Sequence, residues 1–208
     1  MKYTRILVLV DCYLPSYKSG AKQMHDLSVE LLRYASEVTV LTTSHEISPA
    51  IDFSMEEGVR VIRVRTPRIK GAGHVARAIT EMRLSLLVWR RARRYLLNHP
   101  ADLIIFYSPS IFWGALVRRL KTLWRCRTYL ILRDIFPEWA ADAGVLNRGF
   151  VYKLFRRQAI KQYDTADVIA VQSPGDLAYF HRNFSEKCHR LETLHNWTRL
   201  NESILPKT

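Results

Sequence analysis

Short apolar runs alternate with longer amphipathic segments along almost the whole chain. Runs that are apolar throughout indicate strands buried on both faces of a parallel sheet. The strands that we expect occupy residues 5–10, 38–42, 59–64, 102–106, 128–132, 167–171 and 190–194, with arginines interleaved at 59–64. The intervening segments with helical periodicity are residues 21–33, 71–98, 111–123, 151–163 and 174–183. Residues 44–58 have mixed polarity and contain Pro49, so we expect a loop there.

This alternation predicts the α/β class. We expect a Rossmann-like, three-layer α/β/α domain with a mostly parallel sheet of about seven strands. A hydrophobic content of 48% in 208 residues is enough for a core and argues against disorder. The chain holds three cysteines without a CxxC pair, and its first apolar run, residues 6–10, is too short for a signal peptide or a membrane span. We therefore expect a cytoplasmic protein with reduced thiols.

The charge is strongly basic and unevenly distributed. Thirty-two Lys and Arg against 19 Asp and Glu give a net charge of +13. Residues 60–94 hold eleven basic residues and one acid, Glu81, which is a net +10. Such a charge attracts polyanions, whether nucleic acid, an anionic membrane or phosphorylated substrates, and does not choose among them.

The long helix expected at residues 71–98 carries much of this charge. At 3.6 residues per turn Arg83, Arg90 and Arg94 fall in one stripe, and Leu86 and Leu87 lie toward that side. The residues expected to face the sheet are Ala78, Met82, Trp89, Ala92 and Leu96. Basic residues mixed with exposed leucines suit the surface of an anionic membrane. A solvated basic face is the equally weighted alternative.

Two segments place polar residues directly after buried strands. They are Tyr107-Ser-Pro-Ser-Ile-Phe-Trp113 and Arg133-Asp-Ile-Phe-Pro-Glu-Trp139. In open parallel sheets this edge is where ligands bind. Asp134 or Glu138 can orient or deprotonate a hydroxyl, and Arg133 can hold a phosphate or pair with Asp134. The alternative is a structural ion pair with a loop-stiffening proline.

The turn after the first strand is a weaker candidate. Lys18 would add charge, and Ser19-Gly20-Ala21 would offer backbone N–H groups to a phosphate at a helix start. An ordinary β–α turn is an equally good interpretation. His181, Cys188, His189 and His195 have no spacing typical of zinc sites, so we expect no metal site.

The chain resembles the N-terminal domain of GT4-type glycosyltransferases of the GT-B fold, particularly bacterial enzymes of surface-polysaccharide biosynthesis. Five segments in order carry the resemblance: Gly20-Ala21, Tyr107-Ser-Pro-Ser110, Arg133-Asp-Ile-Phe-Pro-Glu138, Ala166-Asp-Val-Ile169 with Ser173-Pro-Gly175, and Asn196-Trp197. It departs from the family pattern at Ala21, where a second Gly is usual, at Ser110, where Pro is usual, and at Arg133, where many relatives carry His.

The resemblance implies a division of labour between two domains. The N-terminal domain of the GT-B fold usually binds the acceptor, and a second domain with a Glu-x7-Glu motif binds the sugar nucleotide. This chain has no two Glu residues at i and i+8. We therefore expect residues 1–198 to be the acceptor-side domain and residues 199–208 to be a tail or the start of a linker to a missing donor domain. The isolated chain is expected to be inactive.

The resemblance also assigns roles to the singled-out residues. It implies transfer of a sugar, of the hexosyltransferase type, to a lipid-linked acceptor in polysaccharide or glycolipid assembly. Catalytic roles fall to Asp134 and Glu138. Acceptor binding falls to Lys18, Tyr107, Ser108, Arg133 and Trp139. The donor-phosphate loop would be Ser19, Gly20 and Ala21, and the membrane-facing residues Arg83, Leu86, Leu87, Arg90 and Arg94.

The implied partners are a donor-binding domain or subunit, an anionic membrane surface and a lipid-linked sugar. The protein would be peripheral on the inner face of the plasma membrane. No cofactor is expected in this domain, and the nucleotide-sugar donor would bind with the missing one. One alternative is a stand-alone, non-catalytic subunit that recruits a split glycosyltransferase to the membrane. Another is a basic nucleic-acid-binding module, which is disfavoured because no known motif appears and the basic helix lacks aromatics on its charged side.

Overall fold

A single eight-stranded sheet organises the molecule, in the order β3-β4-β2-β1-β5-β6-β7-β8. The computed structural model describes residues 3–67, 83–184 and 190–198. The strands are β1 (Tyr3–Leu9), β2 (Ala35–Ser44), β3 (Ile51–Glu56), β4 (Val59–Arg65), β5 (Leu103–Ser108), β6 (Arg127–Leu132), β7 (Val168–Val171) and β8 (Arg190–Thr193). Every pairing is parallel except that of β3 with β4. The α/β, Rossmann-like architecture expected from the sequence is thus confirmed.

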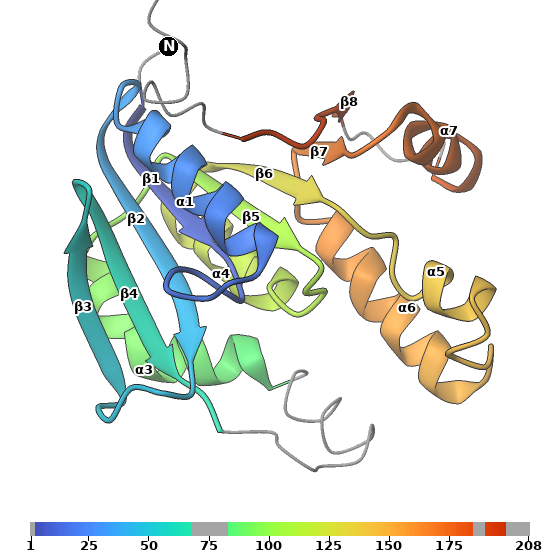
Figure 1. The fold of residues 1–208 in the computed structure, drawn as a ribbon, viewed down its shortest axis with the longest axis horizontal. Coiled ribbons are helices and arrows are strands. Elements are labelled where there is room, and N and C mark those ends of the chain that lie inside the picture. The colour runs from blue at the N-terminus through green and yellow to red at the C-terminus, as the bar shows by residue number, and fades with distance from the viewer. Residues whose placement is uncertain (1–2, 68–82, 185–189, 199–208) are drawn as a thin grey trace, which may run out of the picture.

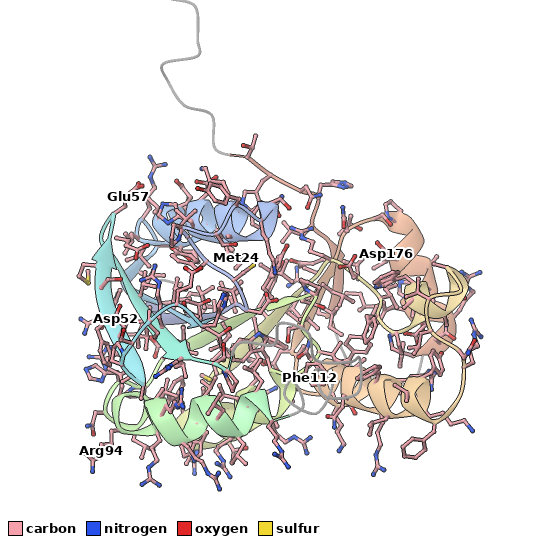
Figure 2. All side chains as sticks on the ribbon, turned by 60° about the horizontal axis from the view of Figure 1, so that its bottom comes forward. Met24, Asp52, Glu57, Arg94, Phe112 and Asp176 are labelled. Atoms are coloured by element: carbon pink, nitrogen blue, oxygen red, sulfur yellow. The ribbon has the colours of Figure 1, made fainter. Side chains whose placement is uncertain are left out.

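Helices cover both faces of the sheet (Figure 1). One face carries α1 (Ser19–Leu31). The other carries α3 (Leu84–Asn98), α4 (Gly114–Trp124), α6 (Phe150–Tyr163) and α7 (Pro174–Asn183), and the short α5 (Glu138–Asp142) follows β6. Figure 2 shows Met24 of α1 on one side of the sheet and Phe112, just before α4, on the other.

The core lies in two layers because successive side chains of a strand point to opposite faces. Ile105 and Tyr107 of β5 pack in the α1 layer, whereas Ile104 and Phe106 pack in the layer under α3, α4 and α6. Both layers are apolar, so the central strands are continuous apolar runs. This explains why all seven strands expected from the sequence are present.

The expectation of a loop over residues 44–58 was wrong, since β3 lies within it. Ile51, Phe53 and Met55 alternate with polar residues, which is the pattern of a half-exposed edge strand. Phe53 and Met55 are 51% and 63% exposed, so this strand lacks the continuous apolar run of the others. The turn to β4 has positive φ at Glu57 and Gly58, as a two-residue hairpin requires. The sheet therefore has eight strands rather than about seven.

Two further differences concern helices. The sequence did not predict α5, which is only one turn long. The helix expected over residues 71–98 is present as α3 from Leu84 onward, and residues 71–82 lie outside the described residues.

Candidate functional site

Loops that follow β1, β5, β6 and β7 meet at one edge of the sheet, because the strands are parallel. The β1–α1 loop is held there from two strands. Thr43 Oγ1 of β2 donates to the carbonyl of Asp11 at 3.0 Å. Arg63 of β4, which also pairs with Glu56 at 2.6 Å, donates to the carbonyl of Leu14 at 2.8 Å. The loop therefore keeps a fixed position on the sheet.

Packing explains part of the sequence of the expected donor-phosphate loop, Ser19, Gly20 and Ala21. Lys18 and Ser19 are exposed at the start of α1, while Gly20 and Ala21 are buried. A Cβ atom at Gly20 would lie 3.0 Å from the hydroxyl oxygen of Tyr107. A larger residue here would force the Tyr107 ring to shift, so packing favours glycine whether or not an anion binds. Lys18 and Ser19 remain accessible to one.

Arg133 joins three parts of this edge. Its Nη1 donates to the carbonyl of Leu194 at 2.6 Å, and its Cζ lies 4.8 Å from the ring centre of Trp197. Trp197 in turn donates from Nε1 to the carbonyl of Gln23 in α1, at 3.1 Å. The guanidinium thus ties the end of β6 to the segment after β8, and Trp197 ties that segment to α1.

The guanidinium of Arg133 also retains donors. Its Nε and Nη2 are buried and have no partner with hydrogen-bond geometry among the described residues. Burial lowers the pKa of Arg133, and the hydroxyl of Tyr107 beside it acts in the opposite direction. An arginine stays charged at neutral pH in any protein site. Both nitrogens are shielded from solvent, so a ligand can accept hydrogen bonds from them only where a covering side chain such as Tyr107 or Trp197 moves aside.

Tyr107 and Ser108 were expected to act together, and the structure separates them. Tyr107 is 5% exposed and lies in the α1 layer beside Arg133. Burial raises the pKa of its hydroxyl, and Arg133 lowers it. Ser108 is fully buried and follows Tyr107 in β5, so it points to the opposite face of the sheet. Only Tyr107 joins the Arg133 cluster.

Asp134 is the exposed carboxylate of the cluster. Partial burial raises its pKa, and the negative charge of Asp176 raises it further. Asp176 lies in the first turn of α7, where the backbone N–H of Asp176 donates to the Ser173 hydroxyl at 3.2 Å and that hydroxyl donates to the Asp176 carboxylate at 2.7 Å. Asp134 has no ion-pair partner among the described residues. Its carboxylate is therefore open to a ligand hydroxyl.

Glu138 and Trp139 stand apart from this cluster in α5. Glu138 Oε1 lies 3.3 Å from Nε of Arg156 in α6, and its side chain is 15% exposed. This pair joins α5 to α6 and differs from the pair of Arg133 with Asp134 that the sequence left open, which these two described residues do not form. Trp139 is 49% exposed and packs partly on Phe136, with ring centres 6.2 Å apart.

Sequence reasoning missed three contributors to the edge. Trp197 was noted only as part of a family-like turn, and Asp176 was not singled out. Gln162 of α6 is fully buried; its Oε1 accepts from the N–H of Trp113 at 3.1 Å and its Nε2 donates to the carbonyl of Ser110 at 2.9 Å. Gln162 thus holds the β5–α4 loop from 49 residues away, and no local pattern signals that.

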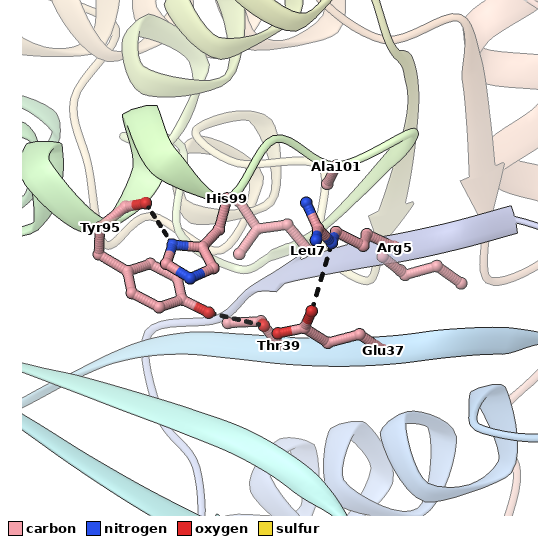
Figure 3. Close-up of a pocket in the computed structure, with 8 residues that line it drawn as sticks. Arg5, Leu7, Glu37, Thr39, Tyr95, His99 and Ala101 are labelled. Atoms are coloured by element: carbon pink, nitrogen blue, oxygen red, sulfur yellow. Dashed lines mark hydrogen bonds and ion pairs between the residues drawn. The ribbon is translucent and has the colours of Figure 1, made fainter.

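A small pocket lies at the opposite, amino end of the strands (Figure 3). Arg5 and Glu37 pair across it at 3.4 Å, and the rings of Tyr95 and His99 stack with centres 4.1 Å apart. Thr39 approaches the Tyr95 hydroxyl at 3.4 Å. The pocket has room for about one water molecule, so it is too small for a sugar. Across the described residues, no group of three or more His, Cys, Asp and Glu could hold a metal ion.

The basic helix α3 presents the face expected of it. Arg83, Leu86, Arg90 and Arg94 are exposed, whereas Leu87 is half-buried. Arg94 projects from the outer side of α3 in Figure 2. The buried positions of α3 are Leu84, Ser85, Val88, Ala92 and Leu96. Trp89 is only partly buried, under the guanidinium of Arg119 at 4.7 Å, and Ala78 and Met82 lie outside the described residues. Within the described part of the chain, no helix has the length and apolar character needed to cross a bilayer.

Comparison with solved structures supports the fold. Sucrose-phosphate synthase from Thermosynechococcus elongatus matches with a TM-score of 0.69 and 13% identity, over 94% of this chain and 48% of that chain. The catalytic domain of starch synthase IV from Arabidopsis thaliana, bound to ADP and acarbose, matches with 0.62 and 11%, over 94% and 52%. A trehalose-phosphate synthase from Burkholderia xenovorans, in complex with glucose-6-phosphate, matches with 0.61 and 13%, over 88% and 43%.

This chain therefore spans about half the length of these glycosyltransferases. No curated protein matches it in sequence. A family model described as a glycosyl transferase 4-like domain matches residues 20–197, which is most of the chain and includes Tyr107, Arg133 and Asp134. The chain belongs to the glycosyl transferase 4-like domain family of the GT-B glycosyltransferases.

Proposed function

We propose that this chain is the acceptor-binding half of a sugar-nucleotide-dependent glycosyltransferase of polysaccharide or glycolipid assembly. The observation that carries the proposal is the pairing of unlike groups at the carboxyl edge. Arg133 supplies a partly buried guanidinium, two nitrogens of which lack a partner with hydrogen-bond geometry, and the next residue, Asp134, supplies an exposed carboxylate. Family membership supplies the reaction class, and this pair supplies the means to hold a hydroxylated, phosphorylated acceptor.

In this proposal each residue has one task. Arg133 and Lys18 bind the acceptor phosphate, and the Tyr107 hydroxyl keeps the guanidinium in place. Asp134 accepts a hydrogen bond from the acceptor hydroxyl and orients its oxygen toward the donor sugar. The exposed ring of Trp139 gives the acceptor sugar an apolar contact.

Glu138 acts indirectly, by fixing the α5 turn through its pair with Arg156. Lys18 and Ser19 are exposed at the start of α1, where the helix dipole would favour the donor diphosphate, although the N–H of Ala21 already donates to the carbonyl of Lys18 at 3.0 Å. The nucleotide sugar itself would be held by a second domain or subunit. Neighbours about twice as long, one of them bound to ADP, support this arrangement.

A lipid-linked acceptor, such as a polyprenyl-diphosphate sugar, requires the domain to work at a membrane. The outer stripe of α3 supports contact with an anionic leaflet. Arg90 and Arg94 are exposed, and no carboxylate among the described residues pairs with them. Leu86, 47% exposed, adds an apolar contact at the start of the same helix.

The test is a transfer assay with the complete enzyme, or with this chain and its donor-binding partner, using labelled nucleotide sugar and membrane lipid extract. We expect Asp134→Asn to reduce transfer about 100-fold or more while the protein stays folded. Glu30→Gln is the matched control, because that carboxylate is also exposed but pairs with Arg33 at 3.0 Å on the other face of the sheet. Full activity of Asp134→Asn would remove the assignment, and transfer by the 208-residue chain alone would refute the division of labour.

A further inference from the structure

Three of the four longer helices that the structure describes on one face of the sheet are basic throughout. Helices α3, α4 and α6 carry four, three and four Lys or Arg residues, eleven in all, and no Asp or Glu. On the other face α1 carries one Lys, one Asp and one Glu. Because α4 packs against both α3 and α6, the three helices form one continuous layer. Its exposed cations include Arg90, Arg93, Arg94, Arg118, Arg119 and Arg157.

Three exposed apolar residues lie close in sequence where α5 leads into α6: Val145 in the connecting turn and Phe150 and Val151 in the first turn of α6, here called the apolar corner. These side chains are 73%, 81% and 42% exposed. Hydrogen bonds fix the backbone of the turn that carries Val145. Gly144 has a φ of 71°, and the N–H of Val145 donates to the carbonyl of Ala140 at 2.9 Å, which ends α5 in a Schellman motif.

In that motif the residue after the glycine commonly packs back on its own helix. Here Val145 does not, and it remains exposed five residues before Phe150, the first residue of α6. A second tie holds the corner, since Arg148 pairs with Asp142 at 2.6 Å. The segment from the end of α5 to the start of α6 thus leaves three apolar side chains exposed to solvent.

We propose that this corner, Val145, Phe150 and Val151, inserts into the interface of an anionic phospholipid bilayer. It forms a second contact point next to the basic layer. Lys153 and Arg157 lie on α6 beyond the apolar residues; both are exposed and unpaired with any carboxylate of the described residues. Apolar side chains bordered by cations are the composition that partitions to an anionic interface. This inference rests on the membrane contact proposed above.

The position of the corner fits that of the acceptor site. Helices of a parallel α/β unit run opposite to the strands, so the starts of α3 and α6 lie at the carboxyl edge of the sheet. Leu86 near the start of α3 and Phe150 at the start of α6 would touch the bilayer near the edge that holds Arg133. The sugar of a lipid-linked acceptor would then reach the Arg133 cluster while its lipid stays in the bilayer.

A nucleic acid fits this surface less well than a bilayer does. Single strands bind through exposed aromatic faces between cations. On this layer the ring of Trp89 is covered by Arg119, and that of Tyr95 stacks on His99. Phe150 is the most exposed ring of the layer, and it stands at a corner rather than along a groove.

The test is binding of the 208-residue chain to vesicles of phosphatidylcholine alone or with 30% phosphatidylglycerol, at about 0.1 and 1 M salt. We expect wild type to bind the anionic vesicles at low salt and to retain a weaker, salt-resistant binding. Phe150→Ser with Val151→Ser should lower the partition coefficient at least about tenfold at both salt concentrations. Arg90→Gln with Arg94→Gln should weaken binding only at low salt. Met55→Ser, on β3 and 63% exposed, is the matched apolar control and should bind as wild type does.

The outcomes separate the two proposals. Wild-type binding by the Phe150/Val151 variant, with circular dichroism confirming its fold, overturns the corner and leaves the contact through α3 intact. Failure of the wild-type chain to bind any vesicle overturns the membrane contact as a whole. Salt-sensitive binding to a random single-stranded oligonucleotide, without vesicle binding, assigns the basic layer to nucleic acid instead.

Discussion

Arg133 is the residue whose replacement tests the arrangement of the edge most sharply. In Arg133→Lys the charge is kept, but the ammonium cannot both reach the carbonyl of Leu194 and cover the ring of Trp197. A charge-assisted hydrogen bond contributes about 1.5–3 kcal/mol, and a cation–π contact about 0.5–2 kcal/mol. Because Trp197 is only partly buried and lysine can regain part of either contact, we expect a loss of about 2 kcal/mol.

The assay is urea unfolding of the purified chain, with thermal unfolding as a second measurement. A loss of that size corresponds to a fall in Tm of about 4–8 °C for a domain of this length. Arg190→Lys is the control, because the Arg190 side chain is 78% exposed and lies 3.7 Å from Glu192; an exposed pair of this kind contributes less than about 1 kcal/mol. A double-mutant cycle with Trp197→Leu should show positive coupling.

The reasoning fails if Arg133→Lys unfolds within about 0.5 kcal/mol of wild type, or no differently from Arg190→Lys. The segment after β8 would then be held without Arg133. Loss of stability with no coupling to Trp197 would instead assign the whole effect to the bond with Leu194.

Three other outcomes follow from the structure. Asp167→Asn should cost about 1–3 kcal/mol at neutral pH; because hydrogen bonds hold the pKa of Asp167 below 3.8, the difference from wild type should begin to shrink as pH falls below that value, as urea unfolding at pH 7 and pH 3 would show. Gly114→Ala should destabilise by about 1–3 kcal/mol, since its Cβ would lie 2.8 Å from Cα of Gln162, whereas Gly149→Ala, with open space around it, should not. In the complete enzyme, the raised pKa of Asp134 should place an acid limb of the pH–rate profile above pH 3.8, and Asp134→Asn should abolish that limb; a limb that survives the substitution belongs to another group.

The fold was largely predictable because its central strands are buried on both faces. The buried part of such a strand, such as residues 6–9 of β1 or 103–107 of β5, is a continuous apolar run, and that signal is local. Strand β3 was not predicted. An edge strand with one open face alternates between apolar and polar residues, and this mixed polarity was interpreted as a loop. The alternation of Ile51, Phe53 and Met55 was present in the sequence and would have identified the strand.

The candidate site was predictable only as far as chain position determines it. Tyr107 and Arg133 follow adjacent parallel strands, so their meeting at one edge follows from the topology. The separation of Ser108 from Tyr107 also follows from the period of a strand, although the sequence analysis grouped them. The contacts of Arg133 with Trp197 and of Glu138 with Arg156 depend on how distant segments pack, and no local pattern specifies them.

The central claim is that this domain recognises the acceptor and not the donor. It is tested most directly by equilibrium binding of the 208-residue chain to a polyprenyl-diphosphate-linked sugar in nanodiscs and, separately, to a nucleotide sugar. We expect saturable binding of the lipid-linked sugar that weakens at least about tenfold in Arg133→Met, since a charged hydrogen-bonding group is lost. Binding of the nucleotide sugar should be far weaker. Tight binding of the nucleotide sugar with no affinity for the lipid-linked sugar would contradict the account.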